Sequence, residues 1–494
     1  MQEFELIAKT FQGLEEVLAQ ELTELGANNV QIGHRMVSFS GDKAMMYRAN
    51  FSLRTAIRVL KPLLHFKAND ADDVYKAVRG VDWQAFFDVH TTFAVDSVVY
   101  SEEFRHSKFV AYKVKDAIVD YFRDTTGERP NIRITNPDVK LHIHISGTDC
   151  TLCLDSSGDS LHLRGYRTGT VEAPINEVLA AGLIMLTGWR GECDFVDPFC
   201  GSGTLLVEAA LIARNIAPGV FRKSYAFEKW KDFDADLFDE IYNDDSQERP
   251  FEHRIYGYDL NKPAVEVALA NAKSAGVADV VQVEQRDVRK FVRPAEKAIM
   301  VTNPPYGERL TPPDLLSLYE VLGKTLKHEF TGNEAWIISA KQELFENLGL
   351  RASLKIQLFN GKLDCDFRKY QLFEGKLGQF RAEGGQVKTD EERRLMSDQR
   401  RFKARRDDFK QRISVPEGEA GADDEWEAQY AILSRRHREF QSSRFGQEGR
   451  KPAAERGTKG TRHAKGKEGG YKGKRDGFKP KGGGYKGKGR RFDD

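Results

Sequence analysis

The sequence has few cysteines, no long apolar run and almost no net charge, and each lack excludes a class of protein. Its 494 residues include 5 cysteines, which is typical of reduced thiols in a cytoplasmic protein rather than of a disulfide framework. No apolar run approaches the roughly 18 residues that a membrane-spanning helix needs, so no membrane partner is expected. The start, Met-Gln-Glu-Phe-Glu-Leu, has neither the basic nor the apolar part of a signal peptide. We therefore expect a cytoplasmic chain with room for two or three domains.

The near-zero net charge of +1 hides an uneven distribution. Residues 449–494 contain 16 Lys/Arg and 5 Asp/Glu, a net charge of +11, so the rest of the chain carries about −10. The same segment repeats Gly-Tyr-Lys-Gly-Lys at 470–474 and 484–488, and a segment of this composition cannot bury a core. We expect a disordered basic tail that binds RNA through phosphate contacts and base stacking, or a tail that serves only solubility.

The most specific pattern follows an apolar run at 298–301, where the chain continues Asn303-Pro304-Pro305-Tyr306. The run predicts a buried parallel strand, which the prolines end because they cannot donate to a sheet ladder. The side-chain carbonyl of Asn303 and the backbone carbonyl of Pro304 form a pair of acceptors suited to one planar amino group. Tyr306 adds an aromatic face for stacking. The pattern therefore predicts a site for an exocyclic amino group.

A second strand, at 195–197, leads into a glycine-rich turn with the sequence Asp197-Pro-Phe199-Cys-Gly201-Ser-Gly203-Thr204. Two glycines allow close approach to a ligand, and a helix N-terminus follows. The turn lacks the third glycine of the dinucleotide fingerprint, and the Asp197 carboxylate repels phosphate but suits an ammonium group. We therefore expect a ligand without a pyrophosphate at this point.

Two further carboxylates end predicted strands. Asp259 follows a strand at 255–258 and is placed to accept hydrogen bonds from ribose hydroxyls. Asp287 follows a third strand and could accept a hydrogen bond from an adenine amino group. The spacing from Gly201 to Asp259 is 58 residues, against the usual 20 or so. Residues 215–253 account for the excess and are predicted to be an insertion.

In this order the motifs resemble the class I S-adenosylmethionine-dependent methyltransferases that act on amino nitrogens. More narrowly, Asn303-Pro-Pro-Tyr-Gly-Glu-Arg-Leu310 and the segment at 165–181, with Gly188-Trp189 after it, are similar to the ribosomal large-subunit guanine-N2 methyltransferases of the RlmL type. The resemblance covers roughly residues 1–375. It implies S-adenosylmethionine as methyl donor and no metal. Long bacterial members carry a second methyltransferase domain, for which this chain ends too soon, so only the guanine-N2 activity is expected.

The fold expected from the pattern and the resemblance is α/β. A class I (Rossmann-like) methyltransferase sheet with an antiparallel terminal hairpin is preceded by an α+β ferredoxin-like/THUMP module. The hairpin strands, at 354–359 and 366–373, flank Asn360-Gly361, and we expect a connection longer than two residues. The expected domains are a ferredoxin-like part at 1–50, a THUMP RNA-binding domain at 51–160, the methyltransferase domain at 161–378, a charged linker or helical segment at 379–448, and the tail.

The resemblance also implies a set of site residues and a reaction. The expected cofactor-binding residues are Asp197, Phe199, Gly201, Gly203, Thr204, Asp259, Asp287 and Asn303. The expected catalytic residues are Asn303, Pro304, Pro305 and Tyr306. The predicted reaction methylates N2 of a guanosine, stacked on Tyr306, in 23S ribosomal RNA or a pre-ribosomal particle.

Several alternatives stay open. The same chemistry suits guanine N2 in transfer RNA, adenine N6 in nucleic acid or a protein glutamine amide, and a non-catalytic RNA-binding or ribosome-assembly factor is a different class. Cys150 and Cys153 lie three apart in a predicted strand and point to opposite faces, so we expect thiols rather than metal ligands. His142 and His144 are expected on the exposed face of a strand. The roles of Glu308 and Arg309, the nucleotide modified and the oligomeric state do not follow from the sequence.

Overall fold

The computed structural model describes residues 3–388 with gaps at 102, 105, 172, 173, 307–310, 362, 376, 383, 385 and 386. These residues all belong to one compact unit. The expected basic tail at 449–494, and most of the charged segment at 379–448, lie outside the described residues. Within the described part, no helix is long and apolar enough to cross a membrane.

The N-terminal part is built on a seven-stranded sheet with the order β2-β3-β1-β4-β7-β6-β5. Its strands are β1 (Phe4–Lys9), β2 (Asn28–Gly33), β3 (Met36–Gly41), β4 (Arg58–Lys67), β5 (Phe93–Tyr100), β6 (Val139–Ser146) and β7 (Asp149–Asp155). All neighbours are antiparallel except β5 and β6, which are parallel. Because β4 pairs with both β1 and β7, the sheet runs without a break across the expected boundary at residue 50.

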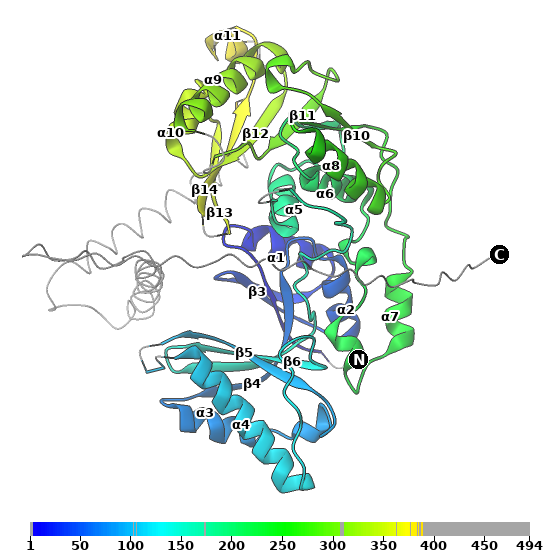
Figure 1. The fold of residues 1–494 in the computed structure, drawn as a ribbon, viewed down its shortest axis with the longest axis vertical. Helices are drawn as coiled ribbons and strands as arrows, with labels where there is room; N and C mark the ends of the chain where they lie inside the picture. Colours follow the sequence, from blue (N-terminus) through cyan, green and yellow to red (C-terminus); the bar gives the residue numbers. More distant parts are fainter. Residues whose placement is uncertain are drawn as a thin grey trace, which may run out of the picture. The chain divides into compact units, whose positions relative to one another are not determined.

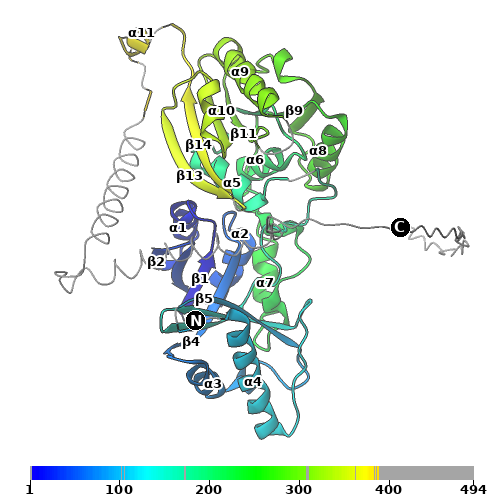
Figure 2. The ribbon, with the colours of Figure 1, turned by 60° about the vertical axis from the view of Figure 1, so that its left-hand side comes forward.

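Four helices accompany this sheet: α1 (Glu15–Glu24), α2 (Lys43–Ser52), α3 (Ala71–Arg79) and α4 (Ser107–Thr126), with a short 3-10 turn, η1 (Trp83–Ala85). Figures 1 and 2 show α3 and α4 side by side against the sheet. The strand β6 alternates as expected, and Leu141, Ile143 and Ile145 are buried in the same core as Val114 and Ile118 of α4. This alternation fixes which face of the sheet the helices cover.

The expectation that His142 lies on an exposed face is wrong. Its side chain is 17% exposed, and Nε2 lies 3.2 Å from Oδ2 of the fully buried Asp155. Asp155 is also paired with Arg58. Burial, with the nearby Arg58 charge, lowers the pKa of His142 to about 3, so the ring is neutral at physiological pH. A strand pattern shows which face a residue is on but not whether long side chains from other strands cover it.

The two cysteines of β7 are buried in different clusters. Cys150 is buried in the helix-covered core, while Cys153 is buried in a small cluster with Ile7 and Leu60. The two thiols therefore point to opposite faces of the sheet. Among the described residues, no group of three or more His, Cys, Asp or Glu side chains could hold a metal ion.

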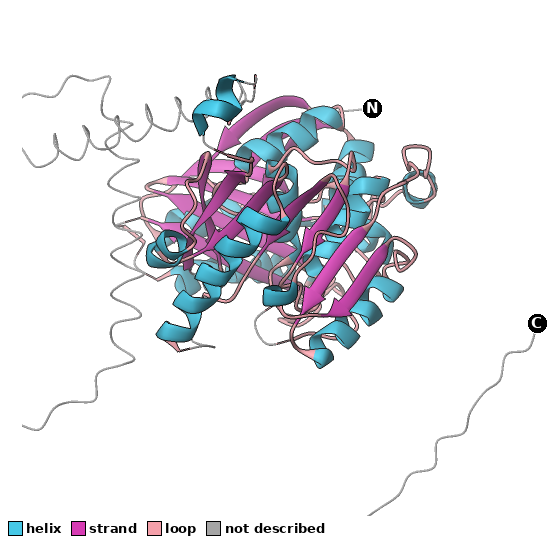
Figure 3. Ribbon diagram, turned by 90° about the horizontal axis from the view of Figure 1, so that it is seen from above, coloured by secondary structure: helices cyan, strands magenta, loops and turns pink. Residues whose placement is uncertain are grey.

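The catalytic part contains the second seven-stranded sheet, with the order β10-β9-β8-β11-β12-β14-β13. The strands β8 (Asp194–Asp197), β9 (Ile255–Asp259), β10 (Val281–Gln285), β11 (Ala298–Thr302) and β12 (Glu334–Ser339) are parallel, and β13 (Leu354–Asn360) and β14 (Leu363–Gln371) are antiparallel additions. The helices are α5 (Glu177–Leu186), α6 (Thr204–Arg214), α8 (Lys262–Ser274), α9 (Pro312–Glu329), α10 (Gln342–Asn347) and α11 (Leu377–Ala382), with the 3-10 turn η4 (Val288–Lys290). Figure 3 shows helices packed along the strands. This arrangement confirms the expected class I sheet with a terminal hairpin.

The connection of that hairpin is shorter than expected. Asn360 of β13 pairs directly with Leu363 of β14, so two residues join the strands instead of a longer loop. Gly361 is the first of these two residues and has a φ of 63°, the positive φ that two-residue hairpin turns require at this position and that glycine adopts readily. The local turn preference therefore decided the geometry here.

The insertion at 215–253 packs against the N-terminal part. It forms the 3-10 turns η2 (Pro218–Phe221) and η3 (Ala226–Lys229) and the helix α7 (Ala235–Tyr242), which lies beside α2 (Figure 1). The ring of Tyr47 in α2 stacks on Phe227 with centroids 4.4 Å apart and meets Phe238 edge-on at 5.7 Å. The insertion thus belongs to the N-terminal core although the chain enters it from the catalytic part.

Candidate functional site

The ends of four neighbouring parallel strands bring the predicted polar residues to one edge of the catalytic sheet. Asp197 ends β8, Asp259 ends β9, Asp287 follows β10 and Asn303 follows β11. These strands are adjacent in the order β10-β9-β8-β11. The sheet therefore brings together all four residues, at the edge where open α/β sheets bind ligands.

The glycine-rich turn lies between β8 and α6, and Asp259 holds it. Gly201 and Gly203 have φ angles of 53° and 78°, which few other residues adopt. A Cβ on Gly203 would lie 2.9 Å from the Cβ of Ala268. The N–H of Gly201 donates to Oδ2 of Asp259 at 3.0 Å, and the N–H of Asn261 donates to Oδ1 at 2.8 Å. Asp259 is therefore oriented by the backbone before any ligand binds.

Asp197 is a buried carboxyl group, 1% exposed. Its Oδ1 accepts hydrogen bonds from the N–H of Phe199 at 3.0 Å and from Oγ1 of Thr302 at 2.6 Å. Burial raises its pKa to about 7, and the neighbouring Asp259 adds to the increase. An ionised carboxylate in such a place is stabilised by a cation beside it.

Asp287 is less available than the sequence suggested. It caps η4, accepting hydrogen bonds from the N–H of Arg289 at 2.9 Å and from Nη1 of the same residue at 3.0 Å. The backbone hydrogen bond from Arg289 lowers its pKa. Asp287 and the 65% exposed Leu260 both line a cavity of about 840 Å³ beside β9 and β10. Leu260 follows Asp259 directly in the chain, so the cavity lies next to the end of β9.

Asn303 has a free acceptor, whereas Tyr306 is tied to the hairpin. Oδ1 of Asn303 is buried and has no hydrogen-bond partner in the described part of the chain. Tyr306 is 8% exposed and its hydroxyl accepts a hydrogen bond from Nδ2 of Asn360 at 2.7 Å. Tyr306 therefore exposes little surface for stacking in this structure, and its hydroxyl contacts a residue 54 positions further along the chain. Glu308 and Arg309 lie outside the described residues.

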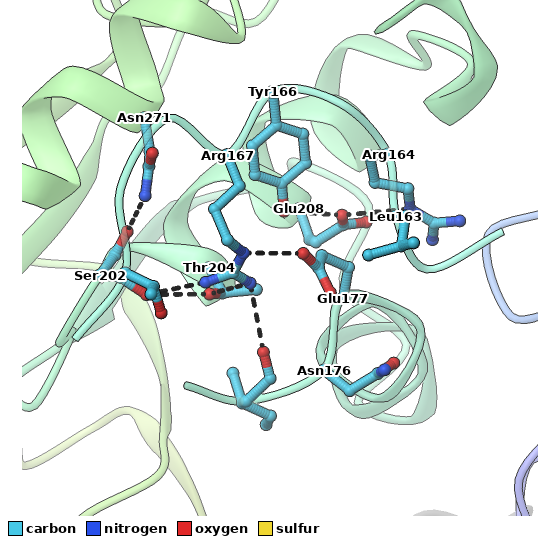
Figure 4. A network of polar contacts seen from close by, with 12 residues as sticks. Leu163, Arg164, Tyr166, Arg167, Asn176, Glu177, Ser202, Thr204, Glu208 and Asn271 are labelled. Carbon is cyan, nitrogen blue, oxygen red and sulfur yellow. Dashed lines mark hydrogen bonds and ion pairs between the residues drawn. The ribbon is translucent and has the colours of Figure 1, made fainter. Parts of the chain in front are cut away.

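Two side chains that the motifs did not single out support the turn (Figure 4). Arg167 donates to Oγ of Ser202 at 3.1 Å and to Oγ1 of Thr204 at 3.0 Å. Asn271 of α8, 1% exposed, donates to the carbonyl of Ser202 at 2.9 Å. Arg167 belongs to the segment at 165–181 on which the family resemblance partly rested, so that segment carried the only signal for it. Asn271 gave none, since a single Asn within a helix is ordinary.

The chain matches three family models in succession. Residues 5–60 match the RlmL ferredoxin-like domain, residues 68–155 the THUMP domain and residues 164–369 the RMKL-like methyltransferase domain. Sheet order and acidic strand ends define the catalytic part as a methyltransferase domain of class I.

Individual relatives agree with these matches. SMU.472, whose crystal structure is complexed with SAH (S-adenosylhomocysteine), is 30% identical in sequence to this chain. The two structures have a TM-score of 0.69, and the match covers 76% of this chain and 100% of that one. A predicted N6-adenine-specific DNA methylase from Listeria monocytogenes str. 4b F2365 is 30% identical, with a TM-score of 0.68 over 75% of this chain and 97% of that one. The chain therefore belongs to the RMKL-like methyltransferase family, with ferredoxin-like and THUMP parts before the catalytic domain.

A longer curated relative also matches. The ribosomal RNA large subunit methyltransferase K/L of Photobacterium profundum is 39% identical over 379 residues, which are 75% of this chain. The chain spans about half of that relative, 53% of its length.

Proposed function

We propose that this chain is an S-adenosylmethionine-dependent methyltransferase that modifies the exocyclic N2 of a guanosine in 23S ribosomal RNA. The observation that carries the proposal is the Oδ1 of Asn303, which is buried and has no hydrogen-bond partner among the described residues. Asn303 directly follows β11, the strand next to the one that Asp197 ends. A buried acceptor without a partner costs about 1–3 kcal/mol, so its presence favours a ligand that donates to it. The names of the relatives, a ribosomal RNA methyltransferase and an SAH complex, support the choice of substrates.

The described residues fit the methyl donor. Asp197 would face the ammonium group, and Asp259 would accept hydrogen bonds from the ribose hydroxyls. The peptides at Phe199, Gly201 and Gly203 would lie along the donor, with Thr204 behind them. Asp287 would accept from the adenine amino group while it keeps its bond to the Arg289 N–H. No metal is part of the proposed site.

When bound, S-adenosylmethionine supplies a methyl group already activated as a sulfonium. The chain must therefore align an amine and stabilise the charge that develops on it. Oδ1 of Asn303 and the carbonyl of Pro304 would accept both N–H groups of guanine N2, which favours a more tetrahedral nitrogen. Pro305 would keep the Pro304 carbonyl in this direction. No strong general base is required, because the proton becomes acidic only after methyl transfer.

Tyr306 has a more demanding part in this proposal. Tyr306 is only 8% exposed, so a guanine would stack on its ring only after the side chain or its neighbours move. We propose that substrate binding exposes the ring face, and that stacking, worth about 1–3 kcal/mol per base, offsets the contacts that this movement breaks.

A second substrate stays open because of one relative. The Listeria protein is described as a predicted N6-adenine-specific DNA methylase, and adenine N6 would present the same two N–H groups to Asn303 and Pro304. The THUMP match at 68–155 favours RNA over DNA as the substrate. The name of the Photobacterium relative favours ribosomal RNA over transfer RNA. A cytoplasmic location follows from that substrate.

The domain boundaries are part of the proposal. We place the ferredoxin-like part at 1–50, the THUMP domain at 51–160 and the methyltransferase domain at 161–378, with the insertion at about 215–253. The charged segment at 379–448 and the RNA-binding tail at 449–494 complete the chain. The three family matches at 5–60, 68–155 and 164–369 support this order.

Nucleoside mass spectrometry of a deletion strain tests the substrate. We expect 23S ribosomal RNA from the deletion strain to lack N2-methylguanosine at one site. The intact gene should restore this nucleoside, whereas a gene with Asn303→Ala should not. Loss of the nucleoside from transfer RNA, or loss of N6-methyladenosine, would contradict the assignment. Unchanged RNA together with a ribosome-assembly defect would favour a non-catalytic factor.

A further inference from the structure

The segment that leads into the catalytic domain contains two arginines with different neighbours. Arg164, 2% exposed, donates from Nη2 to the backbone carbonyl of Arg54 and from Nη1 to the carbonyl of Leu161 at 2.8 Å. Its Nε lies 3.4 Å from Oε1 of Glu208. Arg164 therefore joins the N-terminal part to the helix α6.

The N-terminal acceptor is itself fixed. Arg54 lies between α2 and β4, and its N–H donates to Oε1 of Glu21 at 2.8 Å. The N–H of Thr55 donates to Oε2 of Glu21 at 3.0 Å. Since Glu21 belongs to α1 and is 8% exposed, a buried carboxylate holds the peptide that Arg164 contacts.

Arg167, three residues later, contacts the glycine-rich turn of the catalytic part (Figure 4). Its guanidinium donates to the hydroxyl groups of Ser202 and Thr204, as described above, and to Oε1 of Glu177 at 2.8 Å. Ser202 and Thr204 flank Gly203 in the glycine-rich turn. One guanidinium thus connects this turn to the start of α5.

The turn needs such support because its backbone is permissive. Gly201 and Gly203 both have positive φ angles. Glycine has no Cβ, so steric contacts restrict its backbone less than that of other residues. The supporting segment has little room to move: Gly165, at a φ of 113°, would place a Cβ 2.0 Å from the carbonyl oxygen of Phe221 in the insertion. The backbone between Arg164 and Arg167 is therefore closely packed against the insertion at Gly165.

We propose that Arg167 is a positioning residue for the glycine-rich turn, and that Arg164 makes the order of this turn depend on the docked N-terminal part. The proposal rests on the proposed function, since the turn is the segment assigned to S-adenosylmethionine. It predicts that a change at the contact with the N-terminal part alters cofactor binding without any contact to the cofactor.

Amide hydrogen exchange of the full chain, without cofactor, tests the positioning. We expect Arg167→Met to speed exchange of the amides at 201–206 by about tenfold. Arg164→Met should speed the same amides severalfold, although Arg164 contacts neither Ser202 nor Thr204.

Arg249→Met is the matched control. Arg249 donates from Nε to the carbonyl of Ala213 at 2.8 Å, at the end of α6 that lies away from the glycine-rich turn. Its Nη2 donates to the carbonyl of Arg190 at 2.6 Å. It should leave the turn unchanged. Unchanged exchange at 201–206 in Arg167→Met would overturn the positioning role, and a change confined to the N-terminal part in Arg164→Met would overturn the dependence.

Calorimetry with S-adenosylmethionine adds the functional arm. We expect affinity to fall about tenfold in Arg167→Met and to recover in part in Arg167→Lys, which keeps the charge with fewer donors. Equal affinities of Arg167→Met and the unaltered chain would overturn the role in cofactor binding. If the unaltered chain binds no S-adenosylmethionine but the exchange pattern is as expected, the proposed function fails while the positioning of the turn is supported.

Discussion

At the scale of single residues, the carboxyl groups at the strand ends differ in what already holds them. Both oxygens of Asp259 accept backbone N–H groups, so its orientation is set before a ligand arrives. Asp197 is buried with a raised pKa, and Asp287 is shared with Arg289. The three aspartates therefore differ in role. Asp259 is an oriented acceptor, Asp197 is a buried group whose ionised form favours a cation, and Asp287 caps η4 and is already partly occupied by Arg289.

Asp259→Ala should weaken binding of S-adenosylmethionine by about 1.5–3 kcal/mol, the range for hydrogen bonds to charged groups. The substitution also releases the N–H of Gly201, so the loss belongs at the upper end of that range. Calorimetry measures it. Asp279→Ala is the control, because Asp279 lies just before β10, away from the strand ends that form the site, and pairs with Arg214. Unchanged affinity in Asp259→Ala would mean that the donor binds elsewhere.

Asp197 predicts an unusual dependence of stability on pH. Its pKa is higher in the folded chain, about 7, than in the unfolded chain, about 3.9. The folded state then binds more protons between these values, so this group lowers the free energy of unfolding as the pH rises from about 4 to 7. Asp197→Asn should remove that slope and increase stability at pH 8 by about 1–3 kcal/mol, while it weakens cofactor binding.

Denaturant unfolding of both proteins at pH 5 and pH 8 checks the prediction. The difference in unfolding free energy between variant and unaltered chain should grow with pH. A difference that stays constant would show that Asp197 is ionised at both values or at neither.

At the scale of elements, apolar runs predicted the parallel strands of the catalytic sheet well. The run before Asn303 and the run before Asp259 both became buried strands within one residue of the expected bounds, since a strand covered on both faces is continuously apolar. Hairpin length and side-chain cover were predicted less well. Tyr306 contacts Asn360, and His142 contacts Asp155, partners that sequence periodicity does not identify.

The insertion is the element whose role the sequence did not indicate. Phe238 of α7 is 9% exposed and meets the rings of Tyr47, Phe51 and Phe227. Phe238→Ala should lower the free energy of unfolding by about 3–5 kcal/mol, as for other buried aromatic residues, and free α7 from α2. Denaturant unfolding measures the loss, and hydrogen exchange of α7 locates it.

Tyr242→Ala provides a comparison for Phe238, since Tyr242 lies on the same helix but is 43% exposed. It should cost distinctly less. Equal losses for both variants, or an α7 that stays protected in Phe238→Ala, would contradict the packing of the insertion on α2.

At the scale of the whole molecule, the sequence predicted the order of the parts, and the family matches bear out that order. It did not predict how the parts are joined. Arg164 and Arg54 are 110 residues apart in the chain, and Arg164 and Glu208 are 44 apart. Buried polar contacts of this kind depend on tertiary structure, and no local pattern in a single sequence marks them.

The basic tail adds a prediction that rests on charge alone. Deleting residues 449–494 removes 16 positive charges and none of the proposed site residues. RNA affinity should fall, and its dependence on salt should become shallower because fewer counterions are released. The effect should be similar for unrelated RNAs, since Gly-Lys repeats do not discriminate between bases. Affinities at two salt concentrations, with and without the tail, decide it: an identical slope would show that the tail does not bind RNA.

The central claim is that Asn303 accepts from the amine that receives the methyl group. Its most direct test is single-turnover transfer of a labelled methyl group to unmodified 23S ribosomal RNA, with cofactor affinity measured on the same samples. Asn303→Ala should lower the transfer rate by roughly a hundredfold or more, as expected for loss of one preorganised group at a charged transition state. Cofactor affinity should stay within about a factor of two. Transfer at the unaltered rate would contradict the account, however well the Asn-Pro-Pro-Tyr motif matches its family.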